Sequence, residues 1–129
     1  MPHVHIEYSG NLEPLMDIAD LCETIRAEAA LVDAFPVAGI RVRAIRVDHF
    51  AIADGDAKHS FIDMSVRLRA GRADAVKKAA IERLFQALKE FAQPAMADHS
   101  IALSAEMREI DAALAPKYGT IRDHLEANA

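Results

Sequence analysis

The sequence predicts a two-layer α+β fold, in which two β-α-β units form one four-stranded sheet with both helices on one face. Two long stretches with apolar residues every three or four positions alternate with short segments typical of strands. The order of strand, glycine turn, helix and strand occurs twice, with turns at Tyr8-Ser9-Gly10-Asn11 and Arg69-Ala70-Gly71-Arg72. The 129 residues suit a single domain. We expect pseudo-repeats at about 2–50 and 60–108, followed by a tail at 109–129.

The first unit begins with HVHIEY, residues 3–8, which alternates polar and apolar side chains like a half-buried strand. Ser9-Gly10-Asn11 ends this strand, and Asn11 is the expected cap of the helix that follows. Phe35-Pro36 ends that helix, and IRVRAIRVDHF, residues 40–50, is the second strand. The apolar face of the helix consists of Leu15, Ile18, Cys22, Ile25, Ala29 and Val32.

The second unit follows a loop at 51–59 and begins with a strand at residues 60–68, SFIDMSVRL. Asp74 is the expected cap of a second long helix, and Gln93-Pro94 closes it. SIALSAEMREI, residues 100–110, is the fourth strand, and the tail beyond it predicts irregular structure with a helical turn or two. The apolar face of the second helix consists of Val76, Ala80, Leu84, Leu88 and Phe91.

Strands that are joined through a crossover helix pair in parallel, with a right-handed connection. Both helices should therefore cover the same face of the sheet. We expect the opposite face to carry Ile, Val and Leu, and nothing else in the chain is available to cover it. The sequence thus predicts self-association.

Composition disfavours several classes of protein. The hydrophobic content of 52% indicates a packed core, and the net charge of -5 argues against general nucleic-acid binding. No apolar run approaches the ~20 residues that cross a membrane, and residues 1–15 lack the apolar region of a signal peptide. Cys22 is the only cysteine, which forbids an intrachain disulfide and suits a reducing cytoplasm.

Pro2 directly follows the initiator methionine. Removal of Met1, which aminopeptidases favour before a small residue, would leave a free secondary amine at the start of a strand. An α-amino group has a reference pKa of about 8, and burial or nearby cations lower that pKa toward neutrality, where a general base works best. From its position alone, Pro2 is more simply explained as a residue that starts a strand.

Arginines in both units are candidate ligands for carboxylates. Arg72 lies just before the second helix, where amide N–H groups and the helix dipole favour anions; a solvated arginine at a turn is the alternative. Arg41 and Arg43 are two positions apart on a strand and share a face. One of them could hold a carboxylate with two hydrogen bonds, and an inter-subunit salt bridge is the alternative.

His3 and His5 form a candidate metal pair on one strand face. No third ligand follows at a suitable spacing, so a structural pair is the favoured interpretation. The sequence shows no Ser-His-Asp set, P-loop or dinucleotide fingerprint. We therefore expect neither a metal nor a cofactor.

Two sets of motifs carry a resemblance to a known family. AGRADAVKKAAIERL, residues 70–84, resembles the strand-Gly-Arg-helix motif of the tautomerase superfamily, whose members use an amino-terminal proline as a base. Ala73 stands where that superfamily commonly has a serine cap, which shifts the expected cap to Asp74. Across nearly the whole chain, PHVHIEYSGN, FPVAGIRVRA, RVDHFAIADGD, FIDMSVRLRAGR and LSAEMREI are similar to the double-length, trimeric 5-carboxymethyl-2-hydroxymuconate isomerase family.

The resemblance implies a cofactor-free, cytoplasmic homotrimer that isomerises a dienol polycarboxylate in aromatic catabolism, such as homoprotocatechuate degradation. It implies that Pro2 is the catalytic base and acid and that Arg41 and Arg72 bind the substrate. Arg43 receives no role. The alternatives are a decarboxylase or dehalogenase of the same superfamily, or a non-catalytic trimeric module that binds a ligand.

Overall fold

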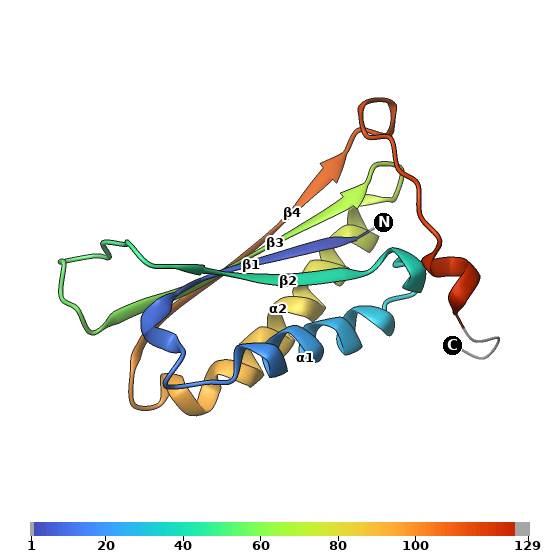
Figure 1. Ribbon diagram of the computed structural model, residues 1–129. Helices are drawn as coiled ribbons and strands as arrows, with labels where there is room; N and C mark the ends of the chain where they lie inside the picture. The colour runs from blue at the N-terminus through green and yellow to red at the C-terminus, as the bar shows by residue number, and fades with distance from the viewer. Residues whose placement is uncertain (1, 126–129) are drawn as a thin grey trace.

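The computed structural model describes residues 2–125 and has the predicted two-layer α+β architecture (Figure 1). Both α-helices of this part of the chain lie on the same side of a four-stranded sheet. The strands are β1 (His3–Ser9), β2 (Arg41–Val47), β3 (His59–Arg69) and β4 (Ser100–Ile110). The helices are α1 (Ile18–Ala30) and α2 (Asp74–Met96), with short 3-10 helices at Gly10–Leu12, Val37–Gly39, Ala112–Leu114 and Ile121–His124.

The sheet has the strand order β2-β1-β3-β4. β1 pairs in parallel with β2, and β3 pairs in parallel with β4, as the crossover helices require. The two central strands, β1 and β3, are antiparallel. Each β-α-β unit thus supplies one central and one edge strand, and the two units meet along the ladder between β1 and β3.

The hydrophobic core lies between the sheet and the two helices. Alternate residues of β1 and β3 are buried, because successive side chains of a strand point to opposite faces. Full burial of one such Ile, Leu or Val side chain is worth about 1.5–3 kcal/mol. Neither described helix combines the length and apolarity that a membrane span needs. The largest apolar side chains of the core include Ile6, Leu12, Leu21, Ile25, Ile62, Met64, Leu68, Leu84 and Leu88.

The face of the sheet that the helices leave uncovered, called the open face below, carries mainly polar side chains and some apolar ones. The expectation that it carries Ile, Val and Leu is confirmed in part, because Ile45, Val47 and Ile110 lie on it by register. Ile101 and Leu103 of β4 pack against the core on the helix side instead. Strand register and alternation put apolar Phe61 on this face as well, beside the following polar side chains: His3, His5, Glu7, Arg41, Arg43, Asp63, Ser65, Arg67, Ser104, Glu106 and Arg108. Because polar side chains predominate, burial of an apolar second face is not the main argument for self-association.

Helix α1 begins later than predicted. Its cap is Asp17, whose carboxylate accepts a hydrogen bond from the backbone N–H of Asp20 at 3.1 Å. Asn11 belongs to the preceding 3-10 helix, and its side-chain amide donates to the carbonyl oxygen of His59 at 2.8 Å. The prediction of Asn11 as the cap is wrong because this amide ties the turn to β3.

Helix α2 differs from the prediction at both ends. Asp74 is its first residue, while Ala73 occupies the cap position without a side-chain hydrogen bond; the Asp74 carboxylate forms an ion pair with Lys77 at 3.1 Å. The helix also continues past Pro94 to Met96, with the Ala97 N–H still bonded to the Gln93 carbonyl at 3.1 Å. The lost N–H of the proline affects only the last turn.

Gly71, in the turn before Arg72, has a φ of +125°, which strains any residue with a side chain. A Cβ at this position would meet no atom within 4 Å. We therefore expect Gly71→Ala to lower the free energy of unfolding by about 1–3 kcal/mol through backbone strain alone, as measured by urea denaturation. Gly119→Ala, at an equally open position without a positive φ, is the control, and an equal loss in both variants would contradict the explanation.

Candidate active site

Pro2 lies buried at the start of β1, with less than 2% of its surface exposed. It continues the alternation of buried side chains that includes Val4 and Ile6. Its carbonyl oxygen accepts a hydrogen bond from the backbone N–H of Arg41 at 3.2 Å. Pro2 is therefore fixed in an apolar environment next to Arg41, while Met1 lies outside the described residues.

Arg72 is held by backbone carbonyls on two other elements. Its Nε donates to the Ala34 carbonyl at 3.0 Å, beyond the end of α1, and its Nη1 donates to the Arg69 carbonyl at 3.2 Å, at the end of β3. Its Nη2 has no hydrogen-bond partner among residues 2–125. The half-buried guanidinium is thus preoriented and keeps one end available for an anion.

The topology brings the segments that carry Pro2, Arg41 and Arg72 to the same end of the sheet. β1 and β2 begin at this end, β3 finishes there, and α2 starts shortly after Arg72 (Figure 1). Parallel pairing of β1 with β2 and antiparallel pairing of β1 with β3 make this arrangement unavoidable. The joint role of these three residues in one site stays a prediction.

The start of β1 is strongly cationic. Burial is the main reason why the pKa of His3 falls to about 4, and the nearby charges of Arg67, Arg41 and Arg43 lower it further. The Nδ1 of His3 is buried without a hydrogen-bond partner in the described part of the chain. Pro2 is itself buried, and burial disfavours protonation of a free amine at that position.

His5 and Arg43 form an intrachain pair on the open face. The Arg43 Nη2 donates to the His5 Nε2, so His5 accepts this bond as a neutral imidazole. Burial, then the charges of Arg43 and Arg67, lower the pKa of His5, with Glu7 acting in the opposite direction. Residues 2–125 contain no group of three or more His, Cys, Asp or Glu side chains that could hold a metal ion.

A cleft of about 250 Å³ opens beside Arg41. One wall is the turn around Pro36 and Gly39, and the other is the tail segment from Lys117 to Arg122. Neither Pro2 nor Arg72 is among its lining residues. No functional residue was expected in the tail, and the only sequence signal there was the pair of cationic residues Lys117 and Arg122.

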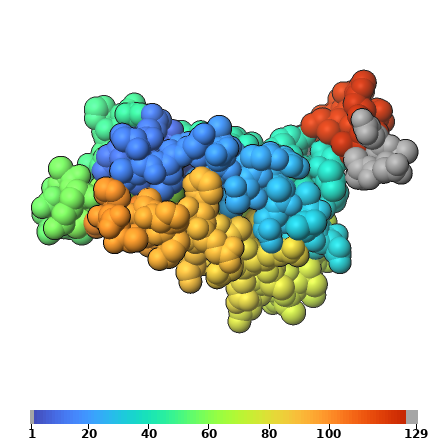
Figure 2. All heavy atoms as spheres, turned by 90° about the horizontal axis from the view of Figure 1, so that it is seen from below, coloured from blue at the N-terminus to red at the C-terminus, as the bar shows by residue number. Residues whose placement is uncertain are grey.

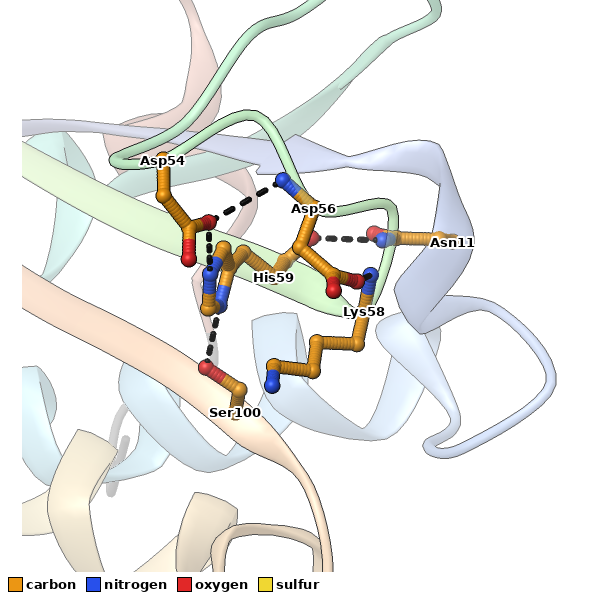
Figure 3. A network of polar contacts seen from close by, with 6 residues as sticks. All are labelled: Asn11, Asp54, Asp56, Lys58, His59 and Ser100. Atoms are coloured by element: carbon orange, nitrogen blue, oxygen red, sulfur yellow. Dashed lines mark hydrogen bonds and ion pairs between the residues drawn. The ribbon is translucent and has the colours of Figure 1, made fainter.

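A second polar network lies at the opposite end of the sheet (Figure 3). The Nδ1 of His59 is 2.7 Å from the Ser100 Oγ, and its Nε2 is 2.8 Å from an Asp54 carboxylate oxygen. This Ser-His-Asp row, absent from the sequence motifs, arises only because β3 pairs with β4. Asp54 is 72% exposed and also accepts the Asp56 N–H at 3.0 Å. We interpret the row as a clamp that holds the loop before β3 against β4.

The lowered pKa of His3 makes stability depend on pH. The pKa of His3 is 6.5 in the unfolded chain and about 4 in the folded protein. Between these two pH values the unfolded chain therefore binds more protons than the folded protein. The free energy of unfolding therefore falls as the pH is lowered through this window. We expect His3→Gln to flatten the dependence of Tm on pH between 6.5 and 4. His99→Gln, in the exposed turn before β4, is the control, and an unchanged slope in His3→Gln would contradict the assignment.

Comparison with known proteins gives a consistent set of relatives. A family model described as 5-carboxymethyl-2-hydroxymuconate isomerase matches residues 2–125. The 5-carboxymethyl-2-hydroxymuconate Delta-isomerase of Escherichia coli is 33% identical over 110 residues, which are 85% of this chain and 87% of that protein. The crystal structure of a 5-carboxymethyl-2-hydroxymuconate isomerase from Deinococcus radiodurans R1 is 34% identical, with a TM-score of 0.88 over 95% of this chain and 92% of the other.

A more distant solved structure, described as a fused 4-OT wild type symmetric trimer, shares the fold. It has 18% sequence identity and a TM-score of 0.64, and the match covers 84% of this chain and 85% of that one. The expected tautomerase-like fold is therefore confirmed.

Proposed function

This chain belongs to the 5-carboxymethyl-2-hydroxymuconate isomerase family and is an isomerase, and we propose that it converts 5-carboxymethyl-2-hydroxymuconate to its keto isomer without a cofactor. The observation that carries the proposal is the burial of Pro2 beside a cationic sheet face. Once Met1 is removed, both features lower the pKa of the ring nitrogen. A partly uncharged amine at neutral pH is what a general base requires.

In the proposed reaction, the Pro2 nitrogen accepts the proton of the 2-hydroxyl group of the dienol. The O–H bond breaks, the conjugated double bonds shift, and the prolinium delivers its proton to C-5. A new C–H bond and a ketone result, and the nitrogen returns to its starting state. One group can perform both transfers when its pKa lies between those of the donor and the acceptor.

Two arginines supply the proposed charge compensation. Arg72 binds the 2-oxygen and the adjacent carboxylate and stabilises negative charge as it develops on that oxygen. Its contacts with the Ala34 and Arg69 carbonyls fix the guanidinium before the substrate arrives. Arg41 binds a more distant carboxylate and orients the chain of the substrate.

We also propose that the protein is a cytoplasmic homotrimer that acts in aromatic catabolism, in the degradation of homoprotocatechuate. The fold shared with a symmetric trimer supports this assembly. The open face carries both arginines, such as Arg67, and carboxylates, such as Glu7 and Asp63. Contacts between subunits on this face would therefore include complementary charge pairs.

The role of Arg72 is testable by substitution. We expect Arg72→Ala to reduce kcat/KM on 5-carboxymethyl-2-hydroxymuconate by about 2–4 kcal/mol of transition-state stabilisation, the size of one lost oxyanion donor. Arg83→Ala is the matched control, because Arg83 also bonds a backbone carbonyl, that of Leu31, at 3.4 Å and links α2 to α1. An unchanged rate for Arg72→Ala would remove this arginine from the mechanism.

The state of the Pro2 nitrogen is testable by mass and by pH. The intact mass of the active protein should lack Met1, and kcat/KM should fall on acidification as the ring nitrogen becomes protonated. Loss of activity on deprotonation instead would indicate a decarboxylase or dehalogenase, in which the prolinium is the acid. An active protein that keeps Met1 would refute the mechanism, because its Pro2 nitrogen is an amide.

A further inference from the structure

The tail extends the molecule beyond its two layers. Figure 2 shows the tail (orange-red) standing out from the body, beside the segment that joins α1 to β2. The side of the tail that faces this segment forms the cleft with Arg41 described above, called the tail cleft below. Its volume of about 250 Å³ suits a small carboxylate-bearing group.

The tail cleft is cationic in an acidic protein. Arg41, Lys117 and Arg122 line it, and no Asp or Glu among residues 2–125 does. None of the three forms an ion pair with an Asp or Glu side chain within residues 2–125. The chain as a whole has 20 acidic and 15 Lys and Arg residues. Like charges gathered in this way repel one another, and an anion between them removes the repulsion.

Arg41 is the residue that the tail cleft shares with the candidate active site. The backbone N–H of Arg41 donates to the Pro2 carbonyl at 3.2 Å, whereas its side chain lines the tail cleft. A ligand that reacts at Pro2 and places a distal carboxylate at Arg41 would therefore have that carboxylate at the tail cleft.

We infer that Lys117 and Arg122 bind the distal carboxylates of the polycarboxylate whose reacting end lies at Pro2. The tail is then a specificity-determining wall of the site, and it selects acids with several carboxylates over monocarboxylates. This inference rests on the proposed function and extends it to two residues outside the β-α-β units.

The weak attachment of the tail supports this role. Leu114 is 80% exposed and Tyr118 is 96% exposed, so the tail has few apolar contacts of its own with the body. Carboxylates held between Arg41 on the sheet and Lys117 and Arg122 on the tail would join the two parts. Binding should therefore protect the backbone amides of the tail from hydrogen exchange.

The test compares the double variant Lys117→Ala/Arg122→Ala with the wild type by calorimetric titration of tricarballylate, a saturated tricarboxylate, and of butyrate. We expect the Kd of tricarballylate to rise about 10- to 100-fold and that of butyrate to stay unchanged. Lys58→Ala/Lys89→Ala removes the same charge at exposed positions outside the tail cleft and should leave both constants unchanged. An equal rise in the Kd of tricarballylate in this control would show that only the overall charge of the protein matters, and it would overturn the inference.

Kinetics separate this inference from the proposed function. In an active isomerase, the double variant should raise KM and leave kcat nearly unchanged, because the tail cations lie away from the reacting atoms. If the wild type is an active isomerase and the double variant has the same KM, the inference is overturned and the proposed function stands. If the wild type binds tricarballylate more tightly than the double variant but has no isomerase activity, only the proposed function is overturned. Failure of the wild type to bind tricarballylate would overturn the inference.

Discussion

The central strand β1 hydrogen-bonds in parallel to β2 and antiparallel to β3, and the candidate active site depends on these two ladders. They bring the start of β1, the start of β2 and the end of β3 to one edge of the sheet. A slip of one residue in either ladder would turn every side chain of that strand to the other face. The buried row of Val4 and Ile6 prevents such a slip on β1, so the core that stabilises the fold also fixes Pro2.

The charges of the open face act on the site at the same edge. Several arginines surround His3, whose imidazole is kept neutral mainly by burial and further by their charges. Placing cations together costs stability, and the chain tolerates this cost although its composition is acidic. A base that must release its proton and bind an anionic substrate benefits from the same field, since the field disfavours the prolinium and favours carboxylates. The electrostatic cost and the proposed catalytic advantage therefore have one origin.

Local patterns in the sequence were sufficient for the fold and for the choice of candidate residues. Alternation and helical periodicity predict all four strands and both helices, and β4 has the predicted bounds of 100–110. The helix ends that these patterns did not predict correctly are each determined by a small number of hydrogen bonds. Asn11 fails as a cap because its amide bonds to β3, and Pro94 stays helical because the following turn keeps its hydrogen bonds.

Features that depend on contacts between distant segments could not be derived from the sequence. Assigning Ile101 and Leu103 to the helix side required the register of β4, and without it the open face was taken to be more apolar than it is. The row of Asp54, His59 and Ser100 and the tail cleft are likewise products of tertiary structure. The Gly-Arg motif identified Arg72, but its anchoring carbonyl at Ala34 lies 38 positions away in the chain.

The two β-α-β units carry different parts of the proposed site. The first supplies Pro2 and Arg41, and the second supplies Arg72. We propose that the units are pseudo-repeats of one domain, in which each kept the polar groups that the other lacks. Because the Arg72 guanidinium is anchored to the carbonyl of Ala34 in the first unit, its orientation depends on both units being packed together. Neither half could therefore form the site alone. The tail is a third segment, and only the complete fold places its cations, Lys117 and Arg122, beside Arg41.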